Sequence, residues 1–218
     1  PVVCVLMIFA LCCVTNVYSD PESGKGYSVA TMLLSGDIVQ FVADNQVVRE
    51  NVVRSAMSSW LIMFAPVICV LPFVKSVSAE KSSLKRFEMH RCGKGVFAVT
   101  RLLAGMLTSA AILCVGYGLF IALAFGVFPS AAEVDKNIVR AALHEMSTAG
   151  FYFSRLAGAF LMGAVCALPA YMISVFSSNK YMMTCIPFMF LHFYNIFIGR
   201  LSKSISLEGR KRLQLFSL

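Results

Sequence analysis

Long apolar runs alternate along this chain with short segments that hold nearly all of its charged residues. Five such runs lie between residues 2 and 198, and none of them contains Asp, Glu, Lys or Arg. A membrane-spanning helix needs about 20 apolar residues, whereas the strands of a membrane barrel alternate over about 10. The pattern therefore predicts helices, and the runs are Val2–Val17, Met57–Val74, Leu102–Phe128, Leu156–Phe176 and Tyr181–Ile198.

The predicted fold class is all-α, a polytopic bundle of transmembrane helices that forms a single domain over residues 1–218. Pro1 stands directly inside an apolar run, so we expect a first helix that is truncated. A secretory signal cleaved after Ser19 is the alternative, but no basic segment precedes the run. With their flanking residues, the expected spans are about 1–18, 57–75, 101–128, 153–177 and 181–199.

The segments between the runs differ sharply in charge. Residues 20–56 hold three basic and five acidic residues, whereas residues 75–101 hold seven basic and two acidic ones. Because Lys and Arg accumulate in cytoplasmic loops, this contrast places the loop 76–100 in the cytoplasm. The loops 19–56 and 129–152 are then expected on the outer side. The basic segment 200–218 does not fit strict alternation, and a re-entrant fifth run or a topology fixed by the earlier helices would each explain it.

The second half of the first outer loop has the periodicity of an amphipathic helix. Its apolar residues share one helical face, and its polar residues, among them Glu50 and Arg54, fall on the other. We expect a helix near residues 37–54 that lies on the membrane surface or packs on the bundle. A partner-binding helix is the alternative reading of the same pattern.

Composition narrows the function classes. Only 14% of the residues are charged, against roughly 25% in a soluble domain. The net charge of +8 comes from loops beside apolar runs, which argues for topology signals and against nucleic-acid binding. Seven of the eight cysteines lie in apolar runs without CxxC or Cys/His spacing, so we expect small buried side chains and no metal or other cofactor.

Small residues recur at every fourth position in two of the runs. Such stripes let neighbouring helix backbones approach closely. Packing within the bundle and a seam between two subunits both remain open. The stripes are Gly118, Ala122 and Gly126 in the third run and Ala159, Gly163 and Ala167 in the fourth.

No catalytic constellation is visible, and no GxxxxGK[ST] phosphate-binding loop occurs. His192, with Tyr194 and Asn195, is the only strongly polar cluster within a run, and it reads as a hydrogen-bonded packing residue or as a substrate contact. Coupled carriers usually keep ionisable residues at membrane depth. A transporter with charge-free runs is expected to draw its energy from a separate protein.

The basic loop holds the most specific pattern in the chain. Glu80-Lys81 follows the second run, and the stretch 84–91 can place Leu84 and Phe87 on one side. A Gly-Lys-Gly break at 93–95 and Arg101 at the start of the third run complete it. This order resembles the membrane subunits of ABC-2 type ABC transporters, in which an E-K/R-x-x-G/S element, a short coupling helix and a basic residue at the next span occupy this position.

The resemblance implies six spans, of which five are visible, and a permease subunit of an ATP-driven exporter in the bacterial cytoplasmic membrane. It also implies a separate cytoplasmic ATPase that binds residues 79–95, and a homo- or heterodimer of permease subunits. A non-transporting scaffold or sensor with an outer binding helix is the alternative. The residues expected to couple to the ATPase are Glu80, Lys81, Leu84, Lys85, Arg86, Phe87 and Arg91.

Overall fold

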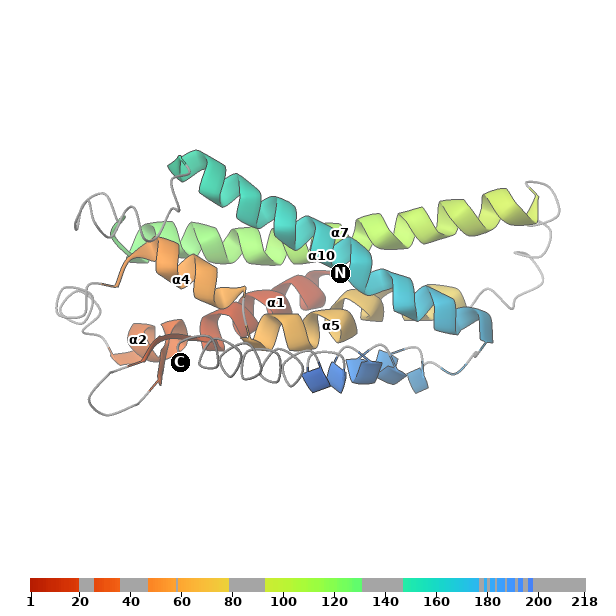
Figure 1. The fold of residues 1–218 in the computed structure, drawn as a ribbon, viewed down its shortest axis with the longest axis horizontal. Helices are drawn as coiled ribbons and strands as arrows, with labels where there is room; N and C mark the ends of the chain where they lie inside the picture. Colours follow the sequence, from red (N-terminus) through yellow and green to blue (C-terminus); the bar gives the residue numbers. More distant parts are fainter. Residues whose placement is uncertain are drawn as a thin grey trace, which may run out of the picture.

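The computed structural model describes residues 1–19, 26–35, 47–57, 59–78, 93–130 and 147–176, and short pieces between 179 and 197. These residues form mainly helices, which run roughly along one common direction (Figure 1). The helices are α1 Val2–Val14, α2 Val29–Ser35, α4 Arg49–Ala56, α5 Ser59–Ser78, α7 Lys94–Val127 and α10 Thr148–Phe176.

Helices α7 and α10 form the most extensive pair in the bundle. Among the described residues, Gly95–Val127 and Thr148–Ile173 are long and apolar enough to cross a membrane. A third span arises if α4 and Leu61–Pro72, which meet at 61°, form one broken helix. Two or three of the five expected spans thus meet this criterion.

Both long helices extend beyond their apolar runs. α7 begins at Lys94, seven residues before the expected span, directly after Gly93, whose φ of 81° is accessible to glycine and rarely to other residues. α10 begins at Thr148, five residues before the expected boundary, and passes through Arg155. The expected loops 76–100 and 129–152 are correspondingly too long, because a charge ends an apolar run without ending a helix.

The first helix ends earlier than expected. α1 stops at Val14, where the Thr15 hydroxyl donates a hydrogen bond to the Leu11 carbonyl at 2.9 Å. The strands β1 Asn16–Ser19 and β2 Gly26–Ser28 then form an antiparallel ribbon. The expected span 1–18 was therefore too long, and the all-α prediction missed a small two-stranded sheet.

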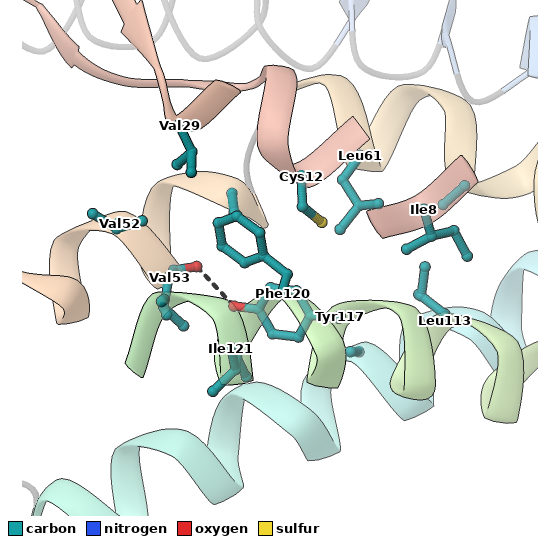
Figure 2. Close-up of a cluster of buried hydrophobic side chains, with 14 of the residues drawn as sticks. Ile8, Cys12, Val29, Val52, Val53, Leu61, Leu113, Tyr117, Phe120 and Ile121 are labelled. Atoms are coloured by element: carbon teal, nitrogen blue, oxygen red, sulfur yellow. Dashed lines mark hydrogen bonds between the residues drawn. The ribbon is translucent and has the colours of Figure 1, made fainter. Parts of the chain in front are cut away.

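The core lies where α1, α4, α5 and α7 meet. Figure 2 shows Ile8 and Cys12 of α1 facing Leu113 and Tyr117 of α7, with Leu61 of α5 beside them. All five side chains are fully buried or nearly so. A further link joins α5 to α7, because the Ser109 hydroxyl donates a hydrogen bond to the Cys69 carbonyl at 3.0 Å.

Helix α4 is shorter than the predicted helix and has one of its two predicted placements. Val48 is extended, and Val47 and Val48 are buried, so the described helix starts at Arg49. Val52 and Val53 pack into the core, as Figure 2 shows. Glu50, which the periodicity placed on the polar face, is 1% exposed. α4 thus packs on the bundle, and it buries a residue of the face that was expected to be polar.

The Tyr117 hydroxyl stabilises the end of α4. It donates a hydrogen bond of 2.7 Å to the carbonyl of Val53, one of the last four carbonyls of that helix, which lack partners within it. We expect Tyr117→Phe to lower the free energy of unfolding by about 1–3 kcal/mol, because a buried carbonyl loses its donor. Unfolding in a sodium dodecyl sulfate titration, followed by circular dichroism, measures this loss. An unchanged transition would contradict the assigned role.

The fifth apolar run is described only in short helical pieces between Tyr181 and Phe197. Phe188 stacks on Phe64 of α5 with ring centroids 6.0 Å apart. His192 stacks in turn on Phe188, with centroids 6.1 Å apart and the rings nearly parallel. These contacts place the pieces beside α5. Tyr194, Asn195 and the segment 200–218 lie outside the described residues.

Candidate functional site at the α4 end of the bundle

A charged cluster lies where the start of α4 meets the end of α7 and the start of α10. The Arg49 backbone N–H donates to the Pro129 carbonyl at 3.1 Å, which fixes α4 to the segment after α7. Glu50 follows in the first turn of α4, where the positive end of the helix dipole favours a carboxylate. Its side chain is 2% exposed.

The Glu50 carboxylate has partners on two helices. Arg49 Nε lies 3.5 Å from Glu50 Oε1, and the Tyr152 hydroxyl of α10 donates to the same oxygen at 3.3 Å. The Arg49 guanidinium also lies over the ring of Phe125 in α7, 4.2 Å from its centroid. The Arg49–Glu50 pair of α4 thus contacts both Phe125 of α7 and Tyr152 of α10.

Two further cations surround the neighbouring aromatic ring. The guanidinium carbons of Arg54 and Arg155 lie 6.0 and 5.2 Å from the Phe151 centroid. Phe151 packs edge-on against Tyr152 with centroids 5.3 Å apart. Three arginines and one glutamate therefore meet around three aromatic rings, those of Phe125, Phe151 and Tyr152. A buried carboxylate such as Glu50 is costly unless it is paired, so this cluster is the candidate functional site.

At the other end of the bundle, where α7 begins and α10 ends, a hydroxyl hydrogen bond joins these two helices. The Tyr171 hydroxyl of α10 donates to the Arg101 carbonyl of α7 at 3.1 Å. A groove of about 460 Å³ extends from Arg101 to Ile112 along α7, toward the middle of that helix, and its lining also includes Tyr171 of α10 and Pro72 of α5. Pro1 lines it as well, so the groove lies next to the start of α1.

The residues expected to couple to an ATPase lie outside the described part of the chain. Glu80, Lys81, Leu84, Lys85, Arg86, Phe87 and Arg91 all fall between the end of α5 and the start of α7. Figure 1 shows that these two helix ends point toward the same end of the bundle, away from α4. The charged cluster and the expected coupling loop thus belong to opposite ends.

The two stripes of small residues lie in different surroundings. In α10, Ala159, Gly163 and Ala167 are buried. A Cβ added to Gly163 would lie 2.8 Å from the Ala110 Cα, so the backbones of α10 and α7 are in direct contact there. The other stripe, in α7, is open: Gly118 is half-buried, and Ala122 and Gly126 are exposed.

The cysteines and His192, the other residues with chemically reactive side chains considered from the sequence, do not join the charged cluster in the described part of the chain. Within the described residues, no three His, Cys, Asp or Glu side chains gather as a metal site. The seven cysteines in that part of the chain are free thiols, and four of them are buried. The His192 ring contacts Phe188, so its described environment is aromatic packing.

Comparison of the chain with known protein-family models, with curated proteins and with solved structures finds no match. The resemblance to ABC-2 permeases therefore rests on the loop sequence.

Sequence reasoning missed the central residue of the cluster. Glu50 stood among five acidic residues of an outer loop, and its pattern suggested a solvent-facing position. Its partner Tyr152 lies 102 residues away, at the start of another helix. The available signal was the adjacency of Arg49 and Glu50, one residue before the apolar Val52 and Val53.

Proposed function

We propose that this chain is the permease subunit of an ATP-driven exporter in the bacterial cytoplasmic membrane. A separate cytoplasmic ATPase binds residues 79–95, and ATP-driven movement of this segment switches the helices between inward- and outward-facing states. The permease works as a dimer, either of two copies or with a similar subunit. The α4 end of the bundle faces outward.

The continuity of α7 is the observation that carries this proposal. The helix starts at Lys94, inside the expected ATPase-binding segment, and runs without a break to Val127. At 1.5 Å per residue its 34 residues span about 50 Å, more than the roughly 30 Å of a hydrocarbon core. α7 therefore connects the expected docking segment to Phe125 in the charged cluster as one rigid element.

The distribution of charge supports an external energy source. Arg101 lies near the start of the candidate span in α7, and Arg155 lies near the start of the one in α10. The apolar runs that follow them, Leu102–Phe128 and Leu156–Phe176, hold no charged residue. The buried carboxylate Glu50 already has an arginine partner and a tyrosine partner. The scaffold alternative required a free binding helix, whereas Val52 and Val53 of α4 pack inside the bundle.

Co-purification tests the proposal. The affinity-tagged full chain, extracted from its native membrane, is expected to carry an ABC ATPase that mass spectrometry identifies. Leu84→Asp with Phe87→Asp is expected to reduce the bound ATPase at least about tenfold, because truncating an apolar anchor at the centre of an interface costs about 2 kcal/mol or more.

Ser177→Asp with Ser178→Asp is the matched control, since it adds the same two charges between the fourth and fifth apolar runs, outside residues 79–95. It is expected to retain the ATPase. The proposal is wrong if the unaltered chain carries no ATPase, or if the Leu84 and Phe87 variant binds as much as the control.

A further inference from the structure

We propose that Arg49, Glu50 and Tyr152 form a latch that keeps the α4 end of the bundle closed, and that this end opens when α4 parts from α7 and α10. The inference rests on the proposed transport function for its purpose. Its structural content, a closed end held by these three side chains, is independent of any ATPase.

α4 is set at an angle to the helix that follows it. Its axis meets that of the Leu61–Pro72 part of α5 at 61°, so α4 does not continue the line of α5. It packs mainly on β1, α5 and α7, and the Tyr152 hydrogen bond joins it to α10. Because α4 is a short helix held by a few contacts, movement at this end of the bundle is expected in α4.

The Arg49–Glu50 ion pair is arranged so that opening leaves neither residue without its counter-charge. Arg49 and Glu50 are neighbours on α4, so the pair moves with that helix and stays intact. Opening breaks the Tyr152 hydrogen bond, the contact of Arg49 with Phe125 and the backbone bond to Pro129. It also breaks the hydrogen bond from the Tyr117 hydroxyl to the Val53 carbonyl. A buried charge left unpaired would prevent opening, whereas these contacts can break and re-form.

A packed apolar layer lies beneath the latch. Figure 2 shows Val52 and Val53 of α4 next to Phe120 and Tyr117 of α7, with Cys12 of α1 on the other side of the Phe120 ring. The Phe120, Tyr117 and Cys12 side chains are fully buried. Parting α4 from α7 and α10 exposes this layer, and the Cys12 thiol becomes a reporter of the open state.

The test measures how fast a membrane-impermeant maleimide modifies Cys12 in the full chain in nanodiscs, resolved by tandem mass spectrometry. Tyr152→Phe removes the hydroxyl that holds Glu50. Modification is expected to accelerate about tenfold, because a hydrogen bond to a charged group shifts an equilibrium by roughly that factor. Cys69, which is paired with Ser109 deeper in the bundle, is expected to stay protected.

Tyr171→Phe is the matched control, because it also removes one hydroxyl hydrogen bond, at the other end of α10. It is expected to leave the Cys12 rate unchanged. Equal acceleration of Cys12 modification in both variants would mean that loss of either hydroxyl loosens the whole bundle. No acceleration in either variant would mean that the Tyr152 hydrogen bond does not keep this end closed. Each of these results would overturn the latch. Because no ATPase is present, these results stand apart from the co-purification test.

Discussion

Gly163→Val is expected to separate α7 from α10 and to destabilise the bundle by about 3 kcal/mol, at the upper end of the range for overpacking. A Cβ at this position would lie 2.8 Å from both the Ala110 Cα and the Ser109 carbonyl oxygen. Both are backbone positions, so no side chain can rotate to make room. The free energy of unfolding, from a sodium dodecyl sulfate titration, measures the effect.

Gly126→Val serves as the control, since an added Cβ there meets no atom within 4 Å. The substitution introduces the same β-branched side chain into a long apolar helix, and it is expected to change stability by less than about 0.5 kcal/mol. Equal losses in the two variants would show that valine disfavours these helices in general and that the contact with Ala110 has no special weight.

Glu50→Ala is expected to cost about 3–5 kcal/mol, the range for breaking a buried ion pair by removing one partner. Arg49 would keep its position over Phe125 without a counter-charge, and the Tyr152 hydroxyl would lose its acceptor. The measurement is again the free energy of unfolding. A loss below about 1 kcal/mol would mean that water reaches the site and solvates Arg49.

Asn51→Ala provides the reference for this variant, because Asn51 is the next residue of α4 and is exposed. Its replacement removes a polar side chain of similar size from the same helix. We expect a change within about 0.5 kcal/mol.

The apolar runs predicted the two long helices because membrane spans are encoded locally. α7 and α10 each contain the run that indicated them. Their starts were misplaced, since Arg101 and Arg155 interrupt the apolar runs while the helix continues on the N-terminal side of each, back to Lys94 and Thr148. Hydropathy detects the part of a helix that suits lipid, and the helix itself ends where its hydrogen bonds end.

The charged cluster could not be predicted, because its contacts are not local. Periodicity assigned Glu50 to a polar face by assuming one helix over residues 37–54. Val48 is extended and the described helix starts at Arg49, so the periodicity over 37–54 does not fix which residues face the bundle. The packing of α4 on α7, next to the start of α10, brings Tyr152 to Glu50. The sheet of β1 and β2 was missed because Thr15 ends α1 inside an apolar run.

The contact of Gly163 with Ala110 lies close to the midpoint of α7. About 24 Å of helix separates Ala110 from Lys94, and about 26 Å separates it from Val127, at 1.5 Å per residue. If α7 tilts as a rigid helix about this contact, its two ends move in opposite directions by nearly equal distances. Any sideways displacement at the Lys94 end would then reach Phe125 with almost its full size and in the opposite direction.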